Sequence, residues 1–186
     1  MRNVLIVISG PSGVGKGTIA KQLVKNNENF ALSVSCTTRK PRRGEVDGRE
    51  YFFISHNEFK ETIENGGFLE YSEHFENFYG TPRQFVLDKL KTKDVILEID
   101  VNGGINVKKT FDNAVYIMIL PPSLKEIENR LIKRQTESID KIKLRMERIE
   151  YELAKANEYD YKVVNDDLNE TVKQIEKIIQ EEKNKE

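Results

Sequence analysis

Residues 4–18 read VLIVISGPSGVGKGT, and this stretch decides the fold. Its first part, Val4–Ile8, is a continuous apolar run of β-branched and aliphatic residues, typical of a strand buried on both faces of a parallel sheet. The run ends near Gly10, and apolar residues at helical spacing follow at Ile19 and Leu23. The sequence therefore predicts a buried strand, a glycine-rich turn and a helix in direct succession.

The turn has the G-x-x-x-x-G-K spacing of a phosphate-binding P-loop. Glycines let backbone N–H groups turn towards phosphate oxygens, and the N-terminus of the helix adds the positive end of its dipole. A glycine-rich turn with a chance lysine is the alternative, but the flanking strand and helix favour the P-loop. The residues expected to contact nucleotide phosphates are Gly10, Pro11, Ser12, Gly13, Val14, Gly15, Lys16, Gly17 and Thr18.

Strand-length apolar runs alternate with helical patterns along most of the remaining chain. The expected strands are Ala31–Val34, Val95–Ile99, Val115–Leu120 and Tyr161–Val164. Helices are expected to begin at Thr81-Pro82, at Ser123 and at Asp167, where capping residues precede apolar periodicity. This alternation predicts an α/β P-loop fold with a mainly parallel central sheet flanked by helices.

The chain of 186 residues fits a single domain. Residues 33–80 interrupt the alternation and are rich in aromatic and turn residues, so we expect a small β-rich insertion there. Residues of about 126–149 form a charged helical segment that we interpret as a lid. The core then comprises about 1–32, 81–125 and 150–186.

Composition excludes several classes of protein. The 30 basic and 31 acidic residues balance, so the total charge implies no nucleic-acid partner. No apolar run approaches the roughly 20 residues that span a bilayer, and no signal peptide is recognisable. Cys36 is the only cysteine, and His56 and His74 have no cluster of further ligands, so neither a disulfide nor a protein-held metal is expected. We expect a cytoplasmic protein.

Residues 33–53 read SVSCTTRKPRRGEVDGREYFF. They closely resemble the guanylate kinase signature S-x-S-x-T-T-R-x-P-R-x-G-E-x-x-G-x-x-Y-x-F, and the resemblance extends over essentially the whole chain. The match is long, irregularly spaced and chemically mixed, which favours a binding site over the solvated basic loop that charge alone would suggest. The resemblance implies a nucleoside monophosphate kinase of the P-loop class.

The resemblance implies a set of GMP ligands in and beside the insertion. The acceptor phosphate would be held by Ser35, Arg39, Arg42, Tyr51 and Tyr79. Two guanidinium groups and three hydroxyls suit a phosphate dianion.

Glu70 lies at the family's guanine-binding position, where a carboxylate can accept from N1–H and the 2-amino group together. Thr81 could hydrogen-bond the base or cap the helix beginning at Pro82, and both roles stay open. Asp100, at the end of a predicted strand, is a candidate for contacting GMP and for ordering magnesium-bound water. The family often has Gln at the position of Asn102.

On the donor side, the resemblance implies that Arg130, Arg134 and Arg145 contact the ATP phosphates and that Asn165 lies beside adenine. Relatives often have Gly at the position of Gln135. The residues expected to act in catalysis are Lys16, Arg39, Arg134 and Arg145.

Gly17 follows Lys16 where GTPases have a Ser or Thr that binds Mg²⁺. The ending Lys-Gly-Thr resembles nucleoside monophosphate kinases, in which the metal is held largely through water and phosphate. Mg²⁺ is therefore expected with ATP and without a direct protein ligand, and Thr18 is assigned to phosphate.

The expected reaction is direct in-line transfer of the γ-phosphoryl group of ATP to GMP, and also to dGMP. The alternatives are a kinase for another nucleoside monophosphate and a non-catalytic guanylate-kinase-like module that binds proteins. ATP and GMP are the expected partners, with no membrane and no nucleic acid. The chain could be a monomer or a homodimer, since the amphipathic last helix could complete the core or join a second copy.

Overall fold

The computed structural model describes residues 2–74, 76–111, 113–133 and 139–185. Within these residues the central sheet is parallel, with the strand order β2-β7-β1-β8-β9. The strands are β1 (Leu5–Ser9), β2 (Phe30–Leu32), β7 (Asp94–Glu98), β8 (Ala114–Leu120) and β9 (Tyr161–Val164). The predicted α/β fold with a mainly parallel sheet is confirmed. The strand predicted at Ala31–Val34 begins and ends earlier, because the chain leaves this sheet to enter the insertion at Ser35.

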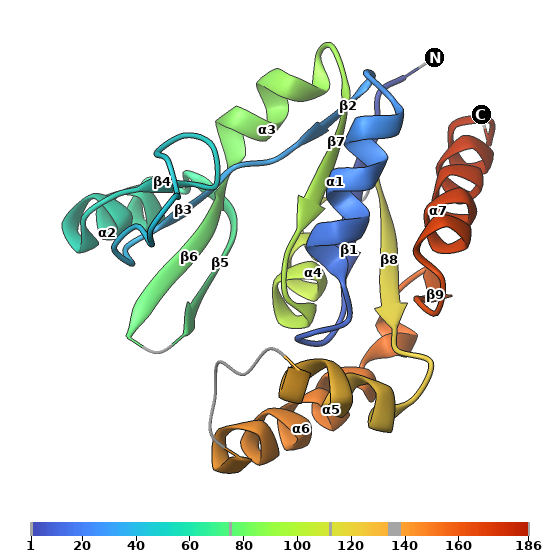
Figure 1. The fold of residues 1–186 in the computed structure, drawn as a ribbon. Coiled ribbons are helices and arrows are strands. Elements are labelled where there is room, and N and C mark those ends of the chain that lie inside the picture. Colours follow the sequence, from blue (N-terminus) through green and yellow to red (C-terminus); the bar gives the residue numbers. More distant parts are fainter. Residues whose placement is uncertain (1, 75, 112, 134–138, 186) are drawn as a thin grey trace.

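Helices cover both faces of the central sheet (Figure 1). They are α1 (Lys16–Asn26), α3 (Arg83–Leu90), α4 (Val101–Lys108) and α7 (Leu168–Lys183). Ile6 and Ile8 of β1 pack in the hydrophobic cluster of α1 and α7, whereas Leu5 and Val7 pack in the cluster of α3 and α4. Successive side chains of a strand point to opposite faces, so a strand between two helical layers must be apolar throughout.

The insertion between β2 and α3 forms a second sheet with the strand order β4-β3-β6-β5. Its elements are β3 (Ser35–Thr37), β4 (Tyr51–Phe53), α2 (His56–Glu64), β5 (Phe68–His74) and β6 (Asn77–Pro82). The ring of Phe59 stacks on Phe68 and on Phe78, with centroids 4.4 and 5.4 Å apart. These aromatic residues give the insertion a small core of its own.

The segment after β8 contains α5 (Leu124–Lys133), α6 (Ile139–Leu153) and the short 3₁₀ helix η1 (Ala156–Glu158). The N–H of Glu126 donates to the Ser123 hydroxyl at 3.1 Å, and the Asp167 side chain accepts from the first turn of α7. The helix starts predicted at Ser123 and Asp167 are confirmed.

The helix start predicted with Thr81 as N-cap and Pro82 as the first helical residue is wrong by one residue. Thr81 and Pro82 belong to β6, and α3 begins at Arg83 after an N-cap residue, Pro82, that has no side-chain cap. Thr81 remains in the strand because it pairs with Glu70 in the antiparallel register of β5 and β6. The capping role left open for Thr81 is therefore excluded.

The carboxyl ends of β7 and β8 point towards the loop before α1 and towards α5, while both chain termini lie at the other end of the sheet (Figure 1). Ligands of open α/β sheets bind at the carboxyl ends of the strands. None of the helices in the described ranges is both long enough and apolar enough to cross a membrane.

Candidate active site

The glycine-rich loop joins β1 to α1 through backbone conformations that side chains rarely adopt. Gly13 and Gly15 have φ angles of 85° and 101°, in the left-handed region. A Cβ at Gly15 would also lie 2.6 Å from the Nδ2 of Asn165. Gly15 is the N-cap of α1 and provides no side-chain cap, so the first turn presents its N–H groups in the manner of an anion site.

Lys16 lies over this loop. Its Nζ donates to the carbonyls of Gly10 at 2.7 Å and Pro11 at 3.3 Å. The ammonium group is thus held at the concave side of the loop, where a phosphate would meet both the charge and the N–H groups. Thr18 is exposed on the first turn of α1.

Asn165 supports the loop from behind. Its Nδ2 donates to the carbonyl of Val14 at 2.7 Å, and its Oδ1 accepts from the Thr171 hydroxyl at 3.2 Å. Arg145, from α6, donates to the Ser12 hydroxyl at 3.3 Å, which places one predicted donor-side arginine at the loop. The side chain of Arg130 and the whole of Arg134 lie outside the described residues.

Three of the predicted phosphate ligands in the insertion lie together. The guanidinium carbon of Arg39 lies 5.4 Å from the centre of the Tyr51 ring, and the Tyr51 and Tyr79 rings meet edge-on at 5.9 Å. A hydrogen bond to Glu45, followed by one to Tyr79, raises the pKa of Arg39, although burial opposes the shift. Burial, with Glu98 as the next cause, raises the pKa of Tyr51, so its hydroxyl stays protonated.

The other two predicted phosphate ligands are less enclosed. Ser35 opens β3 directly opposite Tyr51 in the register of β3 and β4, so it lies beside the aromatic pair. Arg42 is exposed, and its backbone N–H donates to Glu45 at 2.7 Å.

Glu70 is a buried carboxylate with 7% of its surface exposed. Its Oε1 accepts from the hydroxyl of buried Thr81 at 2.7 Å, and its Oε2 lies against Gly103 at the start of α4. Asp100 is the N-cap of α4, accepting from the N–H of Gly103 at 2.9 Å, and it also accepts from the Ser72 hydroxyl at 3.4 Å. These three predicted base-site residues therefore meet where the insertion contacts the core.

Glu98 was not predicted as a site residue, yet it lies between the two groups of ligands. It is exposed at the carboxyl end of β7, and a Cβ at Gly17 would lie 3.1 Å from its Oε2. Its charge also contributes to the raised pKa of Tyr51. Its position in the sequence could have indicated a site residue, because Glu98 directly follows a buried strand segment and precedes Asp100 by two residues.

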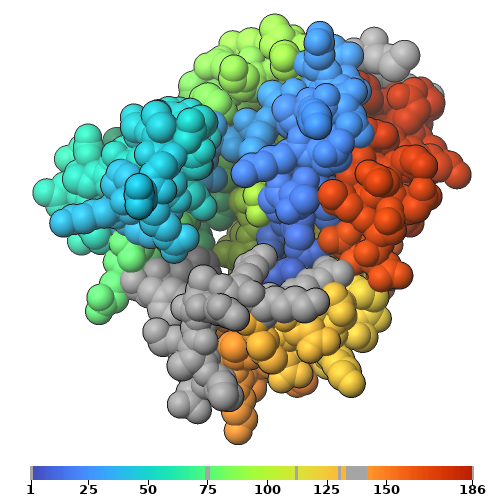
Figure 2. Space-filling view, in the orientation of Figure 1, coloured from blue at the N-terminus to red at the C-terminus, as the bar shows by residue number. Residues whose placement is uncertain are grey.

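The surface is hollowed between the insertion and the face of α1 (Figure 2). Tyr51, from the insertion, and Glu98, from the core sheet, interact electrostatically across this region. The arrangement therefore has a phosphate-binding loop on one side, a guanidinium and two phenols on the other, and a buried carboxylate at the junction.

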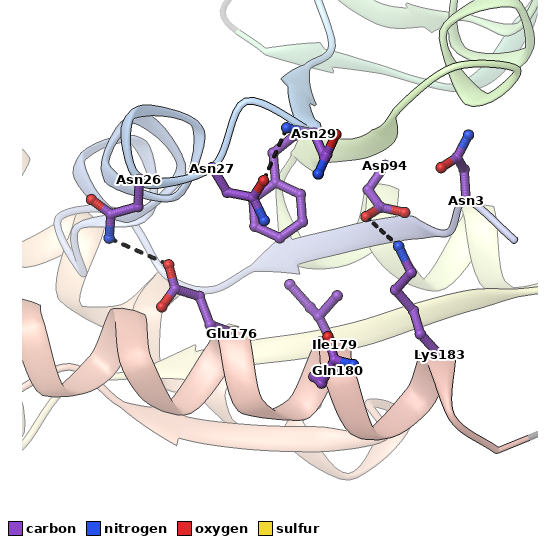
Figure 3. Close-up of a pocket in the computed structure, with 10 residues that line it drawn as sticks. Asn3, Asn26, Asn27, Asn29, Asp94, Glu176, Ile179, Gln180 and Lys183 are labelled. Atoms are coloured by element: carbon purple, nitrogen blue, oxygen red, sulfur yellow. Dashed lines mark hydrogen bonds and ion pairs between the residues drawn. The ribbon is translucent and has the colours of Figure 1, made fainter. Parts of the chain in front are cut away.

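A second hollow, of about 730 Å³, lies at the opposite end of the central sheet (Figure 3). Its charged groups have partners: Lys183 donates to Asp94 at 2.7 Å, and Glu176 accepts from the side-chain amide of Asn26 at 3.3 Å. Asp94 also accepts from the N–H of Val4 at 2.8 Å. These contacts hold the end of α7 to the start of the strands, and none of the predicted ligands lines this hollow.

The phosphate-binding loop faces a second anion site on the separate insertion. This arrangement is that of a P-loop kinase that acts on small phosphorylated acceptors. The model of the guanylate kinase family matches residues 2–182. The chain therefore belongs to the guanylate kinase family.

Individual relatives agree with the family model. The chain is 49% identical to the guanylate kinase of Clostridioides difficile, covering 99% of this chain and 90% of the relative. It is 46% identical to the guanylate kinase of Rickettsia prowazekii, with 99% and 94% covered.

Solved structures give the same result. The crystal structure of guanylate kinase from Anaplasma phagocytophilum superimposes with a TM-score of 0.80 at 34% identity, over 99% of this chain and 88% of that one. Shikimate kinase from Bacteroides thetaiotaomicron, 14% identical over 95% and 98% of the two chains, has a TM-score of 0.57 and shares the fold.

Proposed function

We propose that this chain transfers the γ-phosphoryl group of ATP to GMP, giving ADP and GDP, and that it accepts dGMP as well. The observation that carries the choice of acceptor is the buried Glu70 carboxylate, fixed by the Thr81 hydroxyl at 2.7 Å. Guanine presents two adjacent donors, N1–H and the 2-amino group, which a carboxylate can accept together. Adenine has no such pair of donors.

The donor nucleotide binds at the loop before α1. Lys16 and the N–H groups of the first turn contact its phosphates, and Arg145 approaches from the lid. Asn165 fixes the loop through Val14, and its assignment to adenine rests on the family resemblance. Arg130 and Arg134 complete this set by their place in the sequence. The proposed donor residues are Gly10, Pro11, Ser12, Gly13, Val14, Gly15, Lys16, Gly17, Thr18, Arg130, Arg134, Arg145 and Asn165.

The acceptor nucleotide binds to the insertion. Arg39, Arg42, Ser35, Tyr51 and Tyr79 hold its phosphate, while Glu70, Thr81 and Asp100 hold its base. A phosphate oxygen of GMP attacks the γ-phosphorus, the bond to the β,γ-bridging oxygen breaks, and ADP leaves with that oxygen. No covalent enzyme intermediate is required, because positive charge and alignment supply the catalysis.

Mg²⁺ would enter with ATP, bound to its phosphates and to water, and would neutralise charge on the donor. Among the described residues no group of three or more His, Cys, Asp or Glu side chains could hold a metal. The carboxylate of Glu98, beside Gly17, fits a role as acceptor for metal-bound water, with Asp100 two residues further on.

We further propose that the insertion (about 33–80) and the lid (about 126–149) close on the core when both substrates are bound. Acceptor and donor ligands lie on different parts of the chain, so closure would exclude water before transfer. The chain would act as a monomer or a homodimer, and we place the enzyme in the cytoplasm with its substrates.

The test is a coupled assay of ADP release with GMP, dGMP, AMP, UMP and CMP as acceptors. GMP-dependent release well above the other ribonucleotides supports the proposal. Preference for another base would assign a different monophosphate kinase, and no release with any acceptor in the folded protein would leave a binding module.

A further inference from the structure

The loop between β3 and β4 contains a carboxylate that bonds to the side chain of Arg39. Nη1 of Arg39 donates to Oε2 of Glu45 at 2.9 Å, and Nη2 donates to Oε1 at 3.0 Å. Nη1 also donates to the carbonyl of Lys40 at 2.8 Å. Two parallel N–H···O bonds fix both the position and the plane of a guanidinium group. The pair engages the edge formed by Nη1 and Nη2, and the guanidinium also has a hydrogen bond to Tyr79, another predicted ligand of the acceptor phosphate.

The same carboxylate fixes the backbone of the second arginine. Oε2 of Glu45 accepts from the N–H of Arg42 at 2.7 Å, and the N–H of Glu45 donates to the carbonyl of Arg42 at 3.1 Å. One side chain therefore sets the position of Arg39 through its guanidinium and of Arg42 through its main chain.

The pair is shielded, although the loop around it is exposed. The side chains of Arg39 and Glu45 are 15% and 17% exposed, and the guanidinium lies over the rings of Tyr51 and Phe53 at 5.4 and 5.8 Å. In contrast, the neighbouring pair of Arg49 and Glu50 is 61% and 35% exposed. Shielding from water and contact with two rings distinguish Arg39–Glu45 from an ordinary surface ion pair.

We propose that Glu45 is a positioning residue for the acceptor: it holds Arg39 by one edge and Arg42 by its backbone, so that the phosphate of GMP meets a preformed site. This rests on the proposed assignment of both arginines to that phosphate. The negative charge of Glu45 lies across the guanidinium from the substrate, so the arginine separates the two anions.

The opposite hypothesis is that Glu45 imitates the phosphate and must be displaced by it. The two hypotheses predict changes of opposite sign when the carboxylate is removed. A positioning carboxylate lowers the KM for GMP, so its loss raises that KM. A competing carboxylate raises the KM, so its loss lowers it.

The experiment measures KM for GMP and for ATP in the whole protein with Glu45→Gln. The amide has the size of the carboxylate but turns an NH₂ group towards one of the arginine donors. We expect KM for GMP to rise by about tenfold or more, since small misplacements of a binding group cost this much. KM for ATP should stay unchanged, which a general loss of structure would not allow.

Glu50→Gln is the matched control. Glu50 also accepts from an arginine, Arg49, at 2.6 Å and from a backbone N–H, that of Val46, at 2.8 Å. It lies in the same loop, but we assign it no role towards the phosphate. Its substitution should leave KM for GMP unchanged.

A double-mutant cycle with Arg39→Lys tests the route of the effect. A lysine cannot form the two-bond pair, so Glu45→Gln should raise KM for GMP less in that background, where only the contact with the Arg42 backbone remains. If Glu45→Gln fails to fold, Glu45→Asp, which withdraws the carboxylate by one methylene, takes its place in every comparison. A fall or no change in KM for GMP, or the same rise in the Arg39→Lys background, overturns the proposal. Absence of GMP kinase activity in the wild type would instead refute the proposed function.

Discussion

The two oxygens of Glu70 lie in different surroundings, which makes the carboxylate sensitive to replacement by an amide. Oε1 accepts from Thr81 at 2.7 Å, and Oε2 lies where a Cβ at Gly103 would approach to 3.0 Å. In Glu70→Gln one oxygen becomes an NH₂ donor, whichever way the amide turns. If guanine donates to this carboxylate, the substitution removes an attraction and sets two donors against each other.

A hydrogen bond to a charged group contributes about 1.5–3 kcal/mol. Since 1.36 kcal/mol is a factor of ten in rate, kcat/KM for GMP should fall roughly ten- to two-hundred-fold. IMP keeps N1–H and lacks the 2-amino group, so its kcat/KM should fall less and the gap between the two substrates should narrow.

The assay compares kcat/KM for GMP and IMP in the wild type and in Glu70→Gln. Glu73→Gln serves as the control, because Glu73 is exposed on the same strand. An equal fall for both substrates would refute the assignment of Glu70 to the 2-amino group, and base selection would then rest on Thr81, Asp100 or the backbone.

Three further predictions follow from the same site. Lys16→Ala should lower kcat/KM through the loss of about 3–4 kcal/mol of transition-state stabilisation, the effect of losing one preorganised charge. The melting temperature should stay near that of the wild type, and normal turnover would remove Lys16 from the mechanism. ATP and GMP together should reduce the radius of gyration in solution scattering more than either alone, and an unchanged radius would rule out closure. The hydrogen bond from Arg39 lowers the pKa of Glu45 to about 2. The ion pair therefore stays intact through the pH range in which an ordinary carboxylate is protonated, and it is lost only as the pH falls through about 2. As the pH falls below about 6, KM for GMP should therefore rise only because the substrate phosphate is protonated. A second rise in KM near pH 4.5 that is absent in Glu45→Gln would contradict this prediction.

The fold could be predicted because its determinants are local in the sequence. The run Val4–Ile8 must be buried on both faces, and the glycines that follow specify the turn. Residues 168–183 carry their apolar face at helical spacing, and Val172, Ile175 and Ile179 are buried as expected. Periodicity and capping are properties of neighbouring residues, so the sequence contains them directly.

The role of Thr81 could not be settled in this way. A threonine before a proline is a good helix start by local rules, yet here strand pairing with Glu70 prevails. That pairing joins residues 11 positions apart across a bulged hairpin, and no local pattern indicates it. The same limit applies to Asn165, which bonds to Val14 across 151 positions.

Gly17 departs from the Ser or Thr that usually follows the P-loop lysine, and Glu98 was not predicted as a site residue. The two observations are related, because the two residues lie side by side. In P-loops with Ser or Thr after the lysine, that hydroxyl contacts the metal. Here a Cβ at Gly17 would lie 3.1 Å from Oε2 of Glu98, so the carboxylate occupies the space that a larger side chain would need. A carboxylate accepts from metal-bound water, whereas a hydroxyl at this place would bind the ion directly. If the metal is held through water and Glu98, as proposed above, glycine at position 17 leaves that carboxylate its room.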